Sequence, residues 1–407
     1  MDLSQLTDLL KLSSIPVIAA LVGWVTNWIA IQLTFYPIKF MGIRPIFGWQ
    51  GIIPSKAKRM AELCVDSVLS KLGTVSEIIE QMDPKTISAY ILTNIAPRNE
   101  ELVDEIMRKR HHTLWQNLPK KVKAILYKRV ADQLPIIMEE LVADISPKIE
   151  SLFDLKLMVV EKLEADKSLL NKIFLSCGHQ EFKFIIKSGL LFGFLFGLPQ
   201  LALWYFLPLP WILPLCGFLV GWATNWVALN MIFRPIQKHH IAGMTIHGLF
   251  LKRQDEVSEA FCKIVTEEIL TVDQVANAML TGPHAARTRA IIQKHFENLI
   301  DEAAGVIKPL TQIAMGPKGF ADIKEDTGYK AIDLSTEILK DPLFNQERAQ
   351  AVQVIMEERM KKLPSEDFQN LLRPCFQEDE VKLIAIGGVL GALAGLGQLI
   401  YVFGFTI

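Results

Sequence analysis

Leu21-Val22-Gly23-Trp24-Val25-Thr26-Asn27-Trp28-Ile29-Ala30 is the stretch that decides the fold of this chain. It returns 198 residues later as Leu219-Val220-Gly221-Trp222-Ala223-Thr224-Asn225-Trp226-Val227-Ala228, with eight of the ten residues identical. Phe-x-Pro-Ile follows both copies. A match of this length predicts an internal repeat.

The same offset returns at the far end of each copy. Gly189, Gly193 and Gly197 correspond to Gly387, Gly391 and Gly395, and Gln200 corresponds to Gln398. The sequence therefore predicts two repeats, residues 1–207 and 208–407, each with two membrane spans. Because two spans return the chain to its starting side, the predicted duplication is parallel and not inverted.

Four apolar segments predict the membrane spans. A helix needs about 20 apolar residues to cross a bilayer, and residues 15–36, 186–207, 211–233 and 383–405 meet that requirement. The Leu-Pro-Leu-Pro stretch from Leu207 to Pro210 supplies the turn between the second and third spans. We therefore expect an all-α polytopic membrane protein with four transmembrane helices.

Two long segments between the spans, residues 60–182 and 255–379, are predicted to be soluble and helical. Val122, Leu126, Leu134 and Met138 recur near helical spacing, for example. Asp-Pro and Gly-Pro pairs divide these segments into shorter helices; they are Asp83-Pro84, Gly282-Pro283 and Gly316-Pro317. We expect two helical bundles packed as one body.

Charge places both soluble segments on one side of the membrane. Lys and Arg cluster next to them, while the loop between the second and third spans has no charge. The positive-inside rule then predicts that both segments are cytoplasmic. A formal net charge of −1 gives no reason to expect a nucleic-acid partner.

Motifs for catalysis are missing from the sequence. It has no phosphate-binding glycine loop, no His-Glu-x-x-His and no Gly-x-Ser-x-Gly. The five cysteines are scattered and are expected to be reduced thiols. We therefore expect a protein that is not an enzyme and has no cofactor, metal or catalytic residue.

Asn27 and Asn225 form the first candidate site, because an amide inside a span needs a hydrogen-bond partner. Gly23 and Gly221 lie one turn away on the same helix face. Two interpretations stay open, an interhelical fastener and a polar substrate or ion site. The glycine stripes that precede Gln200 and Gln398 indicate close helix packing, with a gap for a lipid chain as the alternative.

Two tryptophan pairs belong to the same site. Trp24 and Trp28, like Trp222 and Trp226, are four residues apart and therefore share a helix side. Their depth in the spans favours packing against a neighbouring helix over lining a ligand groove.

A second candidate site follows each first span. Residues 46–54 and 246–251 are partly apolar, and five basic residues border them: Lys56, Lys58, Arg59, Lys252 and Arg253. Such a segment suits an interfacial hairpin that contacts anionic lipid headgroups. A plain connector is the alternative.

These motifs resemble the bacterial membrane family called domain of unknown function 445 (DUF445), which includes YjiN and YheB. The resemblance rests on the Gly-Trp-x-Thr-Asn-Trp-x-Ala block, on Gly51-Ile52-Ile53-Pro54 and on residues 376–380. It implies an inner-membrane location and this architecture, but no reaction. The second repeat departs from the pattern where Leu251 stands in place of Pro54.

The expected function is therefore binding or organising lipid, or an envelope-associated partner, at the membrane surface. The alternative is a small channel or facilitator with a path past Asn27 and Asn225. Membrane lipids are the expected partners, and the glycine stripes could also support a homo-oligomer.

Overall fold

The computed structural model describes residues 3–43, 47–66, 70–237, 239–241, 244–305, 308–377 and 380–404. Ile46, Glu378, Asp379 and the predicted end of the fourth span at residue 405 lie outside these ranges. Helices dominate the described chain, which divides into two compact units. Unit 1 comprises Met1–Lys71, Val160–Phe261 and Glu357–Ile407, and unit 2 comprises Leu72–Val159 and Cys262–Met356.

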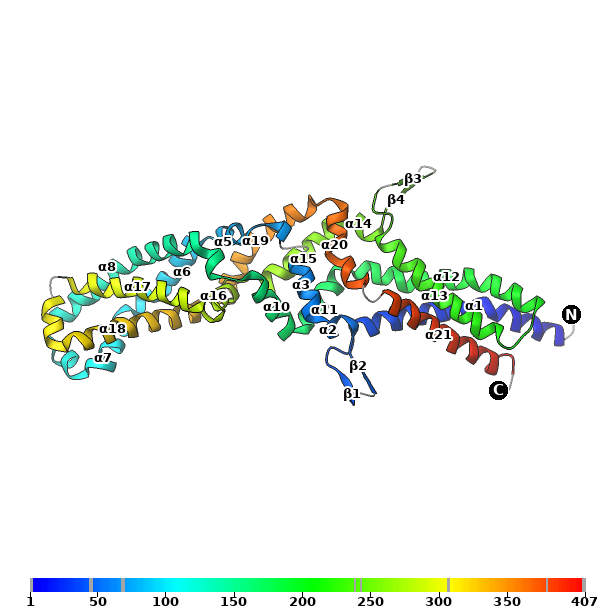
Figure 1. Ribbon diagram of the computed structural model, residues 1–407, viewed down its shortest axis with the longest axis horizontal. Helices are drawn as coiled ribbons and strands as arrows, with labels where there is room; N and C mark the ends of the chain where they lie inside the picture. The colour runs from blue at the N-terminus through cyan, green and yellow to red at the C-terminus, as the bar shows by residue number, and fades with distance from the viewer. Residues whose placement is uncertain are drawn as a thin grey trace. The chain divides into compact units, whose positions relative to one another are not determined.

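Unit 1 contains the four helices that are long and apolar enough to cross a membrane (Figure 1). They are α1 (Leu3–Phe35), α12 (His179–Phe206), α13 (Ile212–Phe233) and α21 (Glu380–Tyr401). α1 packs along α12 and α13 packs along α21, and α12 contacts α13. The four spans predicted from sequence are confirmed as helices of sufficient length.

Short elements complete unit 1. The helices are α2 (Ile52–Ser55), α3 (Ala57–Cys64), α11 (Lys167–Cys177), α14 (Leu249–Lys252) and α20 (Ser365–Gln377). Each connector after a first span carries an antiparallel hairpin, β1 (Met41–Ile43) with β2 (Phe47–Trp49) and β3 (His239–Ile241) with β4 (Met244–Ile246). The strands depart from the all-α expectation, and their hairpins lie largely before residues 46–54 and 246–251, where an interfacial hairpin or a plain connector was expected. Pro37 and Pro235 follow the helix ends as expected.

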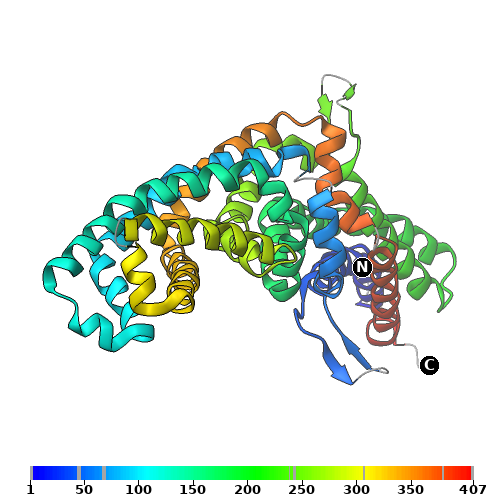
Figure 2. The ribbon, with the colours of Figure 1, turned by 60° about the vertical axis from the view of Figure 1, so that its left-hand side comes forward.

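Unit 2 is a helical body to which both soluble segments contribute. Its helices are α5 (Val75–Gln81), α6 (Pro84–Ile95), α7 (Asn99–Asn117), α8 (Lys120–Ile145), α9 (Ile149–Leu152), α16 (Val272–Thr281), α17 (Ala285–Ala304) and α18 (Lys308–Ile338), with the 3-10 turns η2 (Ala96–Arg98) and η3 (Ser146–Lys148). α17 packs on both α8 and α18, and α7 packs on α18 (Figure 2). Four helices cross the boundary between the units by residue range: α4 (Ser70–Leu72), α10 (Leu155–Ala165), α15 (Gln254–Glu268) and α19 (Pro342–Lys361).

Local sequence explains the helix ends of unit 2. Thr74 begins α5 with a capping box, in which its hydroxyl accepts from the Glu77 amide and the Glu77 carboxylate accepts from the Thr74 amide. Asp83 caps α6 and Pro84 occupies its first position. The predicted break at Gly316-Pro317 is a kink, because α18 continues through Gly316 at φ 73° and ψ 159°.

Candidate functional site

The two span asparagines both hold a neighbouring helix. Asn27 donates from Nδ2 to the Ile185 carbonyl at 2.7 Å, and Asn225 donates to the Leu383 carbonyl at 2.9 Å. Both amides are buried, Asn27 completely. Each bond joins residues 158 positions apart, and therefore α1 is fastened to α12 as α13 is to α21. The geometry matches the fastener interpretation of these residues.

Glycine permits this close approach. A Cβ atom built on Gly23 would lie 2.3 Å from the Gly189 carbonyl oxygen, and one on Gly221 would lie 2.2 Å from the Gly387 oxygen. No side chain fits at such distances, so the helix backbones touch. These distances are those expected of the predicted close packing of the helices. Gln200 and Gln398 are also buried, and Gln398 Nε2 has no hydrogen-bond partner among the described residues.

The tryptophans point outward, contrary to the expectation that they pack against a neighbouring helix. All four side chains are more than 40% exposed, and the rings of Trp222 and Trp226 stack 6.3 Å apart. The sequence spacing placed each pair on one helix side, but spacing does not say which side faces a neighbour. The glycines settle this, because Gly23 and Gly221 contact the partner helix while the tryptophans that follow them lie about 100° or more around the helix.

The basic residues of the second candidate site differ from one another. Lys58, Arg59 and Lys252 are exposed, and Lys56 is half-buried. Arg253, by contrast, donates from Nη1 to both carboxylate oxygens of Glu181 at 2.8 and 2.7 Å, and Glu181 is buried. Burial by itself lowers the pKa of Arg253, but the carboxylates of Glu181 and Glu256 raise it above its ordinary value. Arg253 therefore ties α14 to α12, whereas the sequence suggested a lipid contact.

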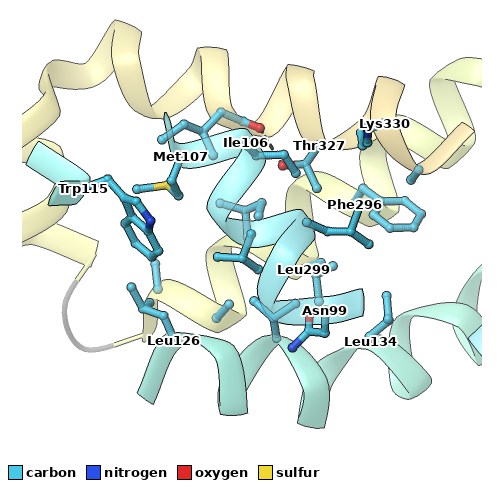
Figure 3. Close-up of a pocket in the computed structure, with 18 of the residues that line it drawn as sticks. Asn99, Ile106, Met107, Trp115, Leu126, Leu134, Phe296, Leu299, Thr327 and Lys330 are labelled. Carbon is cyan, nitrogen blue, oxygen red and sulfur yellow. Dashed lines mark hydrogen bonds between the residues drawn. The ribbon is translucent and has the colours of Figure 1, made fainter. Parts of the chain in front are cut away.

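A large apolar cavity lies inside unit 2, where the sequence indicated only a packed core. Its volume is about 420 Å³, and α7, α8, α17 and α18 supply nearly all of its lining. Figure 3 shows Trp115 at one end of the cavity, Phe296 at the other, and Leu126 and Leu134 of α8 along one wall. Ligand cavities in proteins commonly have volumes of about 300–1,000 Å³ and apolar walls of this kind.

Polar groups in this lining are few and engaged. Asn99 Nδ2 donates to the Tyr127 carbonyl at 2.9 Å, and the Thr327 hydroxyl donates to the Ile323 carbonyl at 2.7 Å. Lys330 pairs with Glu105 at 2.7 Å. The cavity therefore offers hydrocarbon surface to a ligand rather than a reactive group.

Asp104 organises the Trp115 end of the cavity. It accepts hydrogen bonds from Trp115 Nε1 at 2.9 Å and from the Tyr127 hydroxyl, and it pairs with Arg108 at 2.6 Å. Burial raises the pKa of Asp104, but the hydrogen bonds from Tyr127 and Trp115 and the charge of Arg108 outweigh it and hold the pKa below its usual value. Burial and Asp104 together raise the pKa of Tyr127 to about 12.

A smaller cavity of about 190 Å³ continues the apolar interior of unit 2. Phe296 lines both cavities, and Met138 of α8 lines the smaller one. Thr288 of α17 also lines the smaller cavity; it is 1% exposed, and its hydroxyl has no hydrogen-bond partner among the described residues. No charged residue is among those that line this cavity.

Sequence reasoning missed both cavities, although it found part of their walls. Val122, Leu126 and Leu134 line the larger cavity and were predicted as one apolar helix face. An apolar helix face that lines a cavity has the same sequence periodicity as one that packs against another helix. Periodicity shows which side of the helix is apolar, but not how closely the neighbouring side chains fill the space. The unsatisfied Thr288 hydroxyl leaves no sequence signal at all.

Comparison with known proteins gives partial matches. A UPF0754 membrane protein of Anoxybacillus flavithermus is 29% identical over 118 residues, which are 28% of this chain and 32% of that protein. The corresponding protein of Bacillus pumilus is 29% identical over 114 residues, or 27% and 29% of the two chains. One from a Synechococcus strain is 30% identical over 80 residues, 19% of each chain.

These matches span about a third or less of each relative's own length. No family model matches the chain, and no solved structure matches it. This chain is a membrane protein with four candidate spans and a helical body, similar over part of its length to bacterial UPF0754 membrane proteins.

Proposed function

We propose that this chain is a non-enzymatic protein of the bacterial inner membrane whose helical body binds membrane lipid. The observation that carries the proposal is the larger cavity of unit 2, about 420 Å³ with an almost wholly apolar lining. The occupant we propose is the hydrocarbon chain of a lipid. The four candidate spans place the protein where such chains are the most abundant apolar solute.

Free energy supports an occupied cavity. The apolar walls of an unfilled cavity lack the neighbouring atoms that close packing would supply, and this loss of contacts is unfavourable. Water is a poor filler, because the engaged polar groups of the lining offer it too few hydrogen bonds. A hydrocarbon chain fills the space without leaving polar groups unpaired.

We further propose that the chain is a parallel tandem duplication within the DUF445 family, with both soluble segments in the cytoplasm. The sequence repeat and the equal spacing of the Asn27 and Asn225 hydrogen bonds support the duplication. Charge beside the soluble segments supports the orientation. Exposed Lys58, Arg59 and Lys252 are the proposed contacts with anionic headgroups.

A channel between the spans is less well supported. The backbones of α1 and α12 touch at Gly23 and Gly189, and both span asparagines already bind carbonyls. A path between these helices would require them to separate. The molecular mass of the purified protein would reveal a homo-oligomer, and the proteins that co-purify with it would reveal an envelope partner.

Photochemical labelling tests the lipid proposal. Full-length protein in nanodiscs is irradiated with a single-chain lipid that carries a diazirine in its hydrocarbon chain, and labelled peptides are identified by mass spectrometry. We expect labels on α7, α8, α17 and α18. Ala331→Leu, which places a larger side chain in the cavity lining, should reduce those labels severalfold and raise the unfolding midpoint.

Ala349→Leu is the matched control. Ala349 is equally buried in unit 2 but lines neither cavity, so the larger side chain should lower the unfolding midpoint and leave labelling of the folded protein unchanged. Labels confined to α1, α12, α13 and α21, with no response to Ala331→Leu, would refute the lipid cavity.

A further inference from the structure

Thr288 carries an inference that rests on the proposed lipid function and makes its ligand specific. Its side chain is 1% exposed and lines the smaller cavity, and its hydroxyl has no partner among the described residues. A buried hydroxyl without a hydrogen bond is unfavourable, because it has lost its bonds to water without gaining others. A ligand oxygen beside Thr288 would satisfy it.

The two cavities follow one helix face. Thr288, Ile292 and Phe296 are spaced four residues apart in α17 and therefore lie along one side of this helix. Eight residues of helix place Thr288 about 12 Å along the axis from Phe296. Phe296 lines both cavities and therefore lies where they adjoin.

The smaller cavity selects against charge. Its lining contains hydroxyl groups but no Asp, Glu, Lys, Arg or His. An unpaired carboxylate or phosphate buried there would lose its hydration without gaining a counter-charge. A neutral oxygen, such as a hydroxyl, meets the Thr288 side chain without that loss.

We propose that the two cavities together hold one uncharged single-chain lipid, with its polar head at Thr288 and its hydrocarbon chain extending past Phe296 toward Trp115. Thr288 is then the residue that distinguishes a lipid with a polar head group from a plain hydrocarbon. Fatty alcohols and monoacylglycerols have this chemistry.

Competition in nanodiscs tests the head group. A photoreactive fatty alcohol with its diazirine near the chain end labels the full-length protein, and three unlabelled 18-carbon competitors are compared: oleyl alcohol, octadecene and oleate at pH 8. We expect the alcohol to compete roughly tenfold better than octadecene, as one satisfied hydroxyl predicts. We also expect it to compete better than oleate, and the label to lie in the Trp115 peptide.

Thr288→Val should reduce the preference for alcohol over octadecene to below threefold, and should maintain or raise the unfolding midpoint of the protein without ligand. Thr327→Val is the matched control, since the Thr327 hydroxyl lines the larger cavity but is already bonded to the Ile323 carbonyl. It should leave the preference at the wild-type value.

The outcomes separate the two proposals. If octadecene and alcohol compete equally in the wild type, or if Thr288→Val behaves like Thr327→Val, the role of Thr288 is overturned while chain binding stands. If oleate competes better than oleyl alcohol, the proposal that the head group is uncharged is overturned. If no 18-carbon compound competes, the lipid function itself fails.

Discussion

At the scale of single residues, one hydrogen bond from the Asn27 side chain joins two of the candidate spans. The Nδ2 atom of this side chain binds the Ile185 carbonyl, whereas Oδ1 has no hydrogen-bond partner among the described residues. The amide nitrogen of Asn27 is thus bonded while its oxygen is not. This is consistent with a side chain whose role is to hold α12. Asn27→Ala should therefore destabilise the protein by about 1 kcal/mol, the usual size of a polar contact between membrane helices.

The unfolding midpoint of the purified protein in detergent measures this effect. Asn230→Ala is the control, because among the described residues Asn230 donates to the Trp226 carbonyl of its own helix and to no other helix. That variant should change the midpoint little. Equal shifts for the two variants would mean that the Asn27 bond contributes nothing between helices.

Asp104 makes the stability of unit 2 depend on pH. Hydrogen bonds from Tyr127 and Trp115 hold the pKa of Asp104 below its usual value. The folded state thus favours the carboxylate, and its contribution is complete above the unfolded pKa of about 4 and is lost as the pH falls further. Asp104→Asn should lower the unfolding midpoint at pH 7, and the gap from wild type should shrink below pH 4.

Tyr127→Phe provides the comparison, since it removes one hydrogen bond to Asp104 and keeps the one from Trp115. Its pH dependence should lie between those of wild type and Asp104→Asn. A gap between wild type and Asp104→Asn that stays constant from pH 7 to pH 3 would contradict the assignment.

At the scale of helices, glycine sets the distance between paired spans. A Cβ atom on Gly189 would lie 2.3 Å from the Gly23 carbonyl oxygen, so Gly189→Ala must force α12 away from α1. Strain of this kind costs about 1–3 kcal/mol. We expect a lower unfolding midpoint and a larger share of aggregated protein on size-exclusion chromatography.

Gly397 of α21 supplies the matched control. A Cβ atom there meets nothing within 4 Å, and alanine favours a helix over glycine by about 1 kcal/mol. Gly397→Ala should therefore leave the protein as stable as wild type or slightly more so. If Gly189→Ala proved as stable as Gly397→Ala, backbone contact would not limit the packing of α1 and α12.

Helix positions were more predictable than helix surroundings. Pro37, Pro235 and the Gly282-Pro283 pair lie next to helix ends as expected, because backbone geometry acts locally. The outward direction of Trp24 and the ion pair between Arg253 and Glu181 were not predicted, since both depend on which faces meet in three dimensions. The cavities were not predicted for the same reason, because they form between helices that are distant in the sequence.

At the scale of the whole molecule, the proposed function requires that lipid reach a helical body outside the bilayer. The four candidate spans keep that body tethered to its source of lipid. The proposed headgroup contacts, Lys58 and Lys252, are exposed residues of unit 1. A tethered lipid-binding body acts on nearby lipid only, so its side of the membrane decides which leaflet it serves.

Site-directed labelling determines that side. Leu209 lies in the uncharged loop between α12 and α13 and is 57% exposed, and Lys128 is an exposed residue of α8 in unit 2. Because the basic residues border the soluble segments, Leu209→Cys should react with a membrane-impermeant maleimide in intact spheroplasts, and Lys128→Cys only after lysis. The wild-type chain, which has its own free cysteines, measures the background. The reverse pattern would place the lipid-binding body outside the cell membrane and assign it to the outer leaflet, and labelling of both positions before lysis would contradict a single orientation.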